Sequence, residues 1–180
     1  MYACSPGWKA DWISEKEAKK ILTKLSGKIK PCPYGPESIG INYGLHFTGG
    51  EPFMNFELLL NLVQMADTLK IPSTFVETNC FWCKDDKTTK DKLLCLKEAG
   101  LKGLLVSVNP FITEEVPFER TERAVRIGEE IFGRNLIVYQ EFFYHQFRSL
   151  GIKGPLSFEE FLKLGKKSLN YVELIPMGRA

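Results

Sequence analysis

The amino-acid sequence predicts a single α/β domain with a parallel sheet. Short apolar stretches rich in β-forming residues alternate with longer stretches of helical periodicity, and the connections between them are short. No linker, repeat or biased segment divides the 180 residues. Strands that alternate with helices are typical of parallel βαβ units, which build either a doubly wound sheet or a barrel. The pattern alone leaves both architectures open.

Five segments carry helix signals. Ser14 and Glu17 form a capping box at the start of the first, and Ser157 and Glu160 repeat it before the last. Asn55 can cap the second helix, because its side chain can accept hydrogen bonds from early helix amides. The expected helices cover residues 14–26, 56–69, 86–99, 119–132 and 158–168.

Five short apolar segments between the helices are expected to be strands. They cover residues 41–47, 73–78, 104–108, 135–140 and 171–175. The Pro- and Gly-rich stretch 30–40 is expected to be a loop. The chain stops just after the last expected strand, with no helix to cover it, although a parallel sheet needs both faces covered. We therefore expect the chain to be a fragment of a longer protein.

The composition excludes several classes of protein. Hydrophobic residues make up 44%, which argues against intrinsic disorder. With 24 basic and 22 acidic residues the net charge is +2, so there is no electrostatic case for a nucleic acid or an anionic membrane as the main partner. No membrane-spanning run or signal-peptide pattern is present, and a cytoplasmic location is expected. An odd count of five cysteines argues against a disulfide framework.

Polar and glycine residues follow every expected strand, at residues 48–52, 78–80, 107–110, 139–141 and 176–179. Ligands of parallel sheets and barrels bind at these carboxyl ends. Gly49 and Gly50 have no Cβ and allow a ligand to approach the backbone. Glu51 could hold an ammonium group by charge-assisted hydrogen bonds, while Pro52 stiffens the turn. The alternative is that this tetrapeptide is only a tight turn.

Four landmarks in this order resemble one known family. Residues 45–52, LHFTGGEP, resemble the strand and GGEP signature of radical S-adenosylmethionine enzymes. Thr78-Asn79 is similar to the pair that follows the family's third strand. Residues 106–111 and 116–121 resemble its fourth strand and the entry into the next helix. Residues 176–180, PMGRA, resemble its sixth-strand ending, so the resemblance covers the chain from residue 2 to residue 180.

The resemblance implies a partial (β/α)6 TIM-like barrel that lacks its first strand. In this family three cysteines of a Cys-x-x-x-Cys-x-x-Cys loop hold a [4Fe–4S] cluster, and S-adenosylmethionine binds its open iron. An external one-electron donor reduces the cluster, and electron transfer from the cluster cleaves the sulfonium of S-adenosylmethionine. The 5′-deoxyadenosyl radical that results abstracts hydrogen from the substrate. The substrate, whether a small molecule, a peptide or a protein, is not specified by this resemblance.

The resemblance also implies a cofactor site, residue by residue. Gly49, Gly50 and Glu51 would contact the amino group of S-adenosylmethionine, and Ser107 and Asn109 fall where the family holds the ribose or the carboxylate. The other expected contacts are Pro52, Asn79, Gln140, Met177 and Arg179. Local strand-end capping is the alternative for Thr78, Asn79 and Gln140, and a structural or solvent-exposed role is the alternative for Arg179.

The sequence departs from the family in its cysteines. No Cys-x-x-x-Cys-x-x-Cys loop occurs in the 180 residues, so its ligands are expected upstream of Met1, and this chain alone is expected to be inactive. Cys80 and Cys83 form a Cys-x-x-Cys that suits zinc, an extra cluster or a redox pair, or is simply packed in the interior. Two alternative functions follow: a non-catalytic barrel that binds a partner, and a zinc module that adds Cys4 or Cys32 to this pair.

Overall fold

A four-stranded parallel sheet forms the centre of the fold in the computed structural model, which describes residues 11–165 and 169. Each strand lies beside its successor in the chain, so the order is β1-β2-β3-β4. The strands are β1 His46–Phe47, β2 Phe75–Thr78, β3 Gly103–Ser107 and β4 Leu136–Tyr139. The expected α/β class with a parallel sheet is therefore confirmed.

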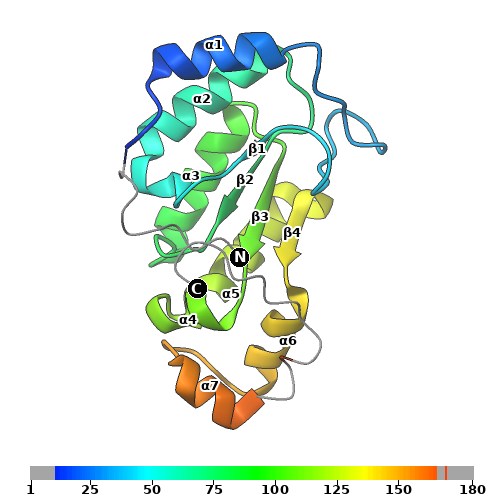
Figure 1. Ribbon diagram of the computed structural model, residues 1–180. Helices are drawn as coiled ribbons and strands as arrows, with labels where there is room; N and C mark the ends of the chain where they lie inside the picture. Colours follow the sequence, from blue (N-terminus) through cyan, green and yellow to red (C-terminus); the bar gives the residue numbers. More distant parts are fainter. Residues whose placement is uncertain (1–10, 166–168, 170–180) are drawn as a thin grey trace.

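Helices connect the strands and cover the sheet (Figure 1). They are α1 Glu15–Leu25, α2 Phe56–Thr68, α3 Asp86–Glu98, α4 Pro110–Glu115, α5 Phe118–Phe132, α6 Glu141–Ser149 and α7 Phe158–Gly165. Two short 3₁₀ helices, η1 Pro52–Asn55 and η2 Gly133–Asn135, precede α2 and β4. The strand arrows point toward the end of the molecule that holds α4, α6 and α7, whereas α1 lies at the opposite end (Figure 1).

The two faces of the sheet differ in what covers them. Alternate strand residues point to opposite faces. Val76, Leu104 and Val106 belong to a large apolar core with residues of α2, α3 and α5. Phe75 and Leu105, on the other face, form a small separate cluster with Ile39 from the preceding loop. One face is thus packed by helices, and the other carries a small separate apolar cluster.

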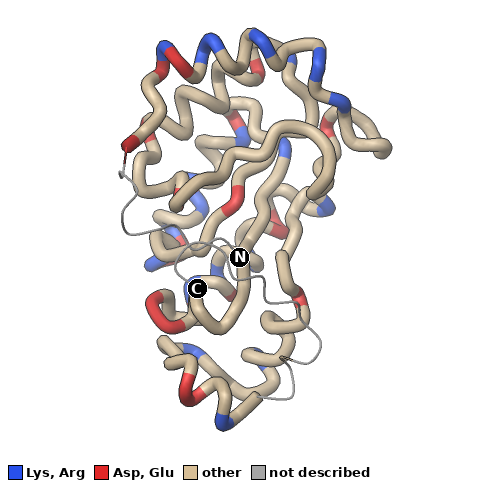
Figure 2. The backbone as a smooth tube through the Cα atoms, in the orientation of Figure 1, with Lys and Arg blue, Asp and Glu red and all other residues tan. Residues whose placement is uncertain are grey.

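Local helix signals agree with the structure. The capping boxes are confirmed: the Ser14 hydroxyl accepts from the backbone N–H of Glu17, and the Ser157 hydroxyl from that of Glu160. The Asn55 side chain accepts from the N–H of Leu58 and caps α2 as predicted. Lys and Arg residues lie along α1, whereas the strands carry few charges (Figure 2). Among the described residues no helix is long and apolar enough to cross a membrane.

The prediction of a strand over residues 41–47 is wrong for most of its length. Only His46 and Phe47 pair with β2. The Tyr43 N–H donates to the Gly40 carbonyl at 2.9 Å and closes a turn. Gly44 follows with φ +81°, and a Cβ there would lie 2.0 Å from the Ser73 carbonyl oxygen. This close approach needs glycine, and it replaces extended pairing with a turn.

Two helices were not predicted from the sequence. In α4, the Asn109 side chain accepts from the N–H groups of Phe111 and Ile112, and Pro110 occupies the first turn. In α6, Phe143 and Phe147 are one turn apart and both fully buried. The expected strand 135–140 is shortened to β4, because Gln140 adopts φ +64° at the start of α6. The expected strand 171–175 and the end of the helix 158–168 lie outside the described residues.

Candidate functional site

A pocket of about 320 Å³ lies at the carboxyl ends of the strands. Loops after β1, β2 and β3 reach it together, because the ends of neighbouring parallel strands meet at one edge of a sheet. Of the residues expected to form a cofactor site, the pocket lining includes Gly49, Gly50, Glu51, Pro52, Asn79, Ser107 and Asn109. Gln140 is not in this lining, and Met177 and Arg179 fall outside the described residues.

The two glycines present bare backbone to the pocket. Gly49 has φ +145°, a conformation that side-chain-bearing residues rarely adopt. A Cβ built on either Gly49 or Gly50 would meet no atom within 4 Å, so open space lies beside both. This segment can therefore receive a ligand against its main chain.

Glu51 is only 6% exposed, and three donors hold its carboxylate. Oε1 accepts from the Phe53 N–H at 3.2 Å and from the Thr78 hydroxyl at 3.0 Å. Oε2 accepts from the Asn79 N–H at 2.7 Å. Since a carboxylate offers about four acceptor positions, one position remains, and it is on Oε2. Glu51 thus ties β1 to β2 and caps η1 while keeping one acceptor for a ligand.

Burial raises the pKa of Glu51 to about 7. The hydrogen bonds from Asn79, Phe53 and Thr78 act against this rise, and the like charge of Glu77 adds to it. Glu51 is consequently close to half ionised at neutral pH. A cation bound beside it would favour the ionised form.

Glu77 is a pocket residue that the sequence analysis missed. Its Oε2 lies 3.2 Å from His46 Nε2 and 3.2 Å from the Thr48 hydroxyl, and the Ser107 hydroxyl donates to its Oε1. The contact with the His46 imidazole is the main cause that lowers the pKa of Glu77. The sequence feature that could have identified Glu77 is a single charged residue in an otherwise apolar strand. Glu77 directly follows Val76, so its side chain points to the face opposite the core.

The pocket is acidic. Glu51, Glu77 and Glu115 line it, and no Lys or Arg does so within the described part of the chain. A cavity with one sign of charge and little screening favours ligands of the opposite sign. The arrangement suits a cationic or zwitterionic ligand and disfavours a polyphosphate.

The polar side chains beside these carboxylates are partly used within the protein. Asn79 Oδ1 accepts from the Phe81 N–H at 3.0 Å, and Asn109 Oδ1 caps α4. What either asparagine can offer a ligand is therefore its side-chain NH₂ group. Gln140 Oε1 is buried and has no hydrogen-bond partner among the described residues.

Cys80 and Cys83 follow β2, and both are fully buried and absent from the pocket lining. Burial raises the pKa of the Cys80 thiol well above its usual value, which keeps it protonated. Cys32 is also buried, and Cys95 lies on α3. In the described part of the chain, no three His, Cys, Asp or Glu residues are grouped so as to hold a metal ion. Cys4 lies outside the described residues.

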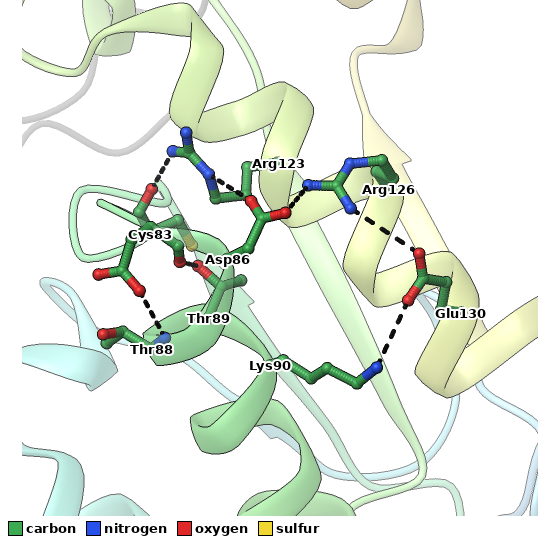
Figure 3. Close-up of polar contacts among 9 residues, drawn as sticks. Cys83, Asp86, Thr88, Thr89, Lys90, Arg123, Arg126 and Glu130 are labelled. Carbon is green, nitrogen blue, oxygen red and sulfur yellow. Dashed lines mark hydrogen bonds and ion pairs between the residues drawn. The ribbon is translucent and has the colours of Figure 1, made fainter.

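Arginines of α5 fix the loop that carries these cysteines. Arg120 and Arg123, one turn apart, donate to the carbonyl oxygens of Phe81 and Cys83, each at 2.6 Å. Asp86, at the start of α3, accepts from Arg123 and is shared with Arg126 (Figure 3). The backbone on both sides of residue 82 is thereby attached to α5.

Comparisons with known proteins add no family to these observations. No protein-family model matches this chain. A search among curated proteins gave no significant match.

Proposed function

We propose that this chain is the core of a radical S-adenosylmethionine enzyme, a partial (β/α)6 barrel without its first strand. Sequential strand order supports the architecture, since each β-strand lies beside its successor. The helices α2, α3 and α5 all contribute to the core on one face of the sheet. A barrel has its helices on the outer face alone, whereas a doubly wound sheet has them on both.

The observation that carries the proposal is the acidic pocket with one unused acceptor on Glu51 Oε2. S-adenosylmethionine has an ammonium group and a sulfonium centre, both cationic. The ammonium would donate to Glu51 while the bare backbone of Gly49 and Gly50 lies against the ligand. Burial strengthens such a charge-assisted bond.

The remaining contacts follow from the strand ends. The NH₂ group of Asn109 would bind the ribose or the carboxylate. The Ser107 hydroxyl donates its proton to Glu77, so it would accept from a ribose hydroxyl, and Asn79 would close the pocket beside Glu51. On one-electron reduction, bound S-adenosylmethionine would release methionine and supply the 5′-deoxyadenosyl radical that abstracts hydrogen from a substrate of unspecified class. A cytoplasmic location and an external one-electron donor belong to the same proposal.

The described residues do not fit the [4Fe–4S] cluster. They contain no group of three metal-ligating side chains, and the buried Cys80 and Cys83 supply two thiols at most. We therefore derive no redox step in this chain. Its part is to bind and orient S-adenosylmethionine and to exclude water from the ammonium group.

A nuclear magnetic resonance titration tests this proposal on the chain itself. S-adenosylmethionine should shift the amide signals of Gly49, Gly50 and Asn79, and ATP at equal concentration should shift them less, because the pocket carboxylates repel the triphosphate. Glu51→Gln should weaken S-adenosylmethionine binding about tenfold. Glu57→Gln, an exposed change on α2, should not.

The ligand 5′-methylthioadenosine provides a further control, because it lacks the ammonium group. Its affinity should be the same for the parent chain and for Glu51→Gln. Absence of shifts at the strand ends, or equal S-adenosylmethionine affinity in Glu51→Gln, would contradict the proposal. Stoichiometric zinc in the purified chain would instead favour the zinc-module alternative.

A further inference from the structure

The hydroxyl of Thr78 is the centre of a small, fully used hydrogen-bond network. The backbone N–H of Cys80 and the indole Nε1–H of Trp82 both donate to Thr78 Oγ1, each at 3.0 Å. A hydroxyl has two acceptor positions and a single proton to donate. Both acceptor positions are filled by groups that can only donate, so the proton must point elsewhere. Glu51 Oε1, at 3.0 Å, is the acceptor it faces.

We propose that Trp82 is a positioning residue for Glu51: its indole N–H orients the Thr78 hydroxyl as a donor to Glu51 Oε1. The inference deepens the proposed function, because Glu51 is the residue proposed to accept from the ammonium group. It rests on that function only for its ligand-binding consequence, since the network exists without a ligand.

Trp82 is held in place from several directions. Its side chain is 5% exposed and stacks on Phe53, with ring centroids 4.1 Å apart and planes 11° from parallel. Phe53 follows Glu51 by two residues, in η1. Arg120 and Arg123 fix the carbonyls of the residues on either side of Trp82. The indole cannot rotate without breaking one of these contacts, so its N–H has a fixed direction.

The oriented hydroxyl decides how Glu51 uses its oxygens. Oε1 is filled by Thr78 and by the Phe53 N–H, which leaves the unused acceptor on Oε2. A proton on Oε1 would face the Thr78 hydroxyl, which has no free position to accept a hydrogen bond. This arrangement therefore favours the ionised form of Glu51. Within residues 11–165, the other titratable groups near Glu51 are Glu77, Cys80 and Glu115, with His46 acting through Glu77.

Trp82→Phe is the direct test, because it retains an aromatic ring to stack on Phe53 and removes the indole N–H together with the smaller ring of the indole. Glutamate side chains labelled with ¹³C at the carboxyl carbon report the pKa of Glu51 in a pH titration without ligand. The pKa should rise by about 0.5, since the Thr78 hydroxyl becomes a weaker donor and gains a free position that can accept a hydrogen bond from protonated Glu51. Trp12→Phe, at a half-exposed tryptophan, should leave it unchanged. An unchanged pKa in Trp82→Phe would overturn the inference.

A double-mutant cycle shows whether Trp82 acts through Thr78. In a Thr78→Val background, Trp82→Phe should have no further effect on the pKa of Glu51, because the hydroxyl is gone. The same rise in both backgrounds would mean that Trp82 acts by packing alone, which contradicts the inference.

The parent chain offers a second readout if Trp82→Phe does not fold. The Nε1–H signal of Trp82 should move with pH at the midpoint of Glu51, whereas that of Trp12 should not. A Trp82 signal that is insensitive to this titration would overturn the inference. Because neither measurement uses a ligand, failure of S-adenosylmethionine to bind would reject the proposed function and leave the role of Trp82 to be decided by the pKa data.

Discussion

Glu51 and Glu77 line the same pocket from the ends of neighbouring strands, yet their surroundings shift their pKa values in opposite directions. Glu51 is almost fully buried among neutral donors, and its pKa is raised to about 7. The Glu77 side chain is 25% exposed beside His46 and two hydroxyls, and its pKa is lowered. Desolvation therefore dominates the pKa of Glu51, and the contact with His46 dominates the pKa of Glu77.

The comparison also separates two roles. Glu77 is satisfied at both oxygens and remains ionised at neutral pH, so it contributes a permanent negative charge to the pocket. Glu51 has one unused acceptor and a pKa near neutrality, so its charge depends on what binds beside it. Three predictions test this difference.

The largest effect is expected for Glu51→Ala at pH 5. The change leaves the donors of Phe53, Asn79 and Thr78 without an acceptor inside the protein. We expect a loss of about 3 kcal/mol in the free energy of unfolding, measured by urea denaturation. Glu57→Ala, on the exposed start of α2, is the matched control. A loss as small as that of the control would mean that Glu51 does not tie β1 to β2.

The next effect is the pH dependence of stability. The folded state holds a proton on Glu51 more tightly than the unfolded chain, since the pKa is raised from 4.5 to about 7. The folded state therefore binds more protons in this window, and stability falls as pH rises. Glu51 should lower the free energy of unfolding by about 2 kcal/mol between pH 5 and pH 7.

Glu51→Gln provides the control for this pH dependence, because it cannot titrate. Its unfolding free energy should lack that slope between pH 5 and pH 7. Glu77 acts in the opposite sense and in another window: its lowered pKa adds stability that is lost as pH falls below 4.5. Identical slopes in Glu51→Gln and the parent chain would contradict the assignment of the raised pKa to Glu51.

The smallest effect is expected for His46→Phe. The phenyl ring can still stack on Phe75, as the His46 ring does with centroids 4.4 Å apart. The change removes the imidazole nitrogen that lies 3.2 Å from Glu77 Oε2 and leaves the two hydroxyl donors in place. The pKa of Glu77 should rise, as measured by carboxyl resonance titration. His145→Phe removes a similar contact from exposed Glu141 on α6 and should leave the pKa of Glu77 unchanged. An unchanged value in His46→Phe would show that the hydroxyls alone hold Glu77 ionised.

Much of the site followed from sequence because its parts are local or repeat at strand ends. Residues after successive parallel strands must meet at one edge of the sheet, and this is enough to bring Gly50, Asn79 and Ser107 together. Capping boxes are similarly readable, because both partners lie within three residues.

The rest of the site depended on distances that the sequence does not contain. The lowered pKa of Glu77 depends on contacts with His46 and Ser107. These residues lie about 30 positions before and after it in the sequence, and strand register brings them beside it. The turn at Gly44 depends on contact with Ser73, and it removed most of a strand that propensity favoured. The hydrogen-bond network of Trp82 depends on the backbone path after β2, where Cys80 adopts φ +67°. No sequence pattern predicted this conformation.

The attachment of this loop to α5 has a consequence for redesigning the molecule. Arg120 and Arg123 contact the carbonyl oxygens of Phe81 and Cys83, not their side chains. Every amino acid has a carbonyl, so the two arginine contacts impose no choice of residue at positions 81 and 83. Packing limits what can stand there, and proline is excluded because the N–H groups of both residues donate hydrogen bonds, to Asn79 Oδ1 and to the Cys80 carbonyl. A library that randomises these two positions can keep the loop path as long as both arginines are retained.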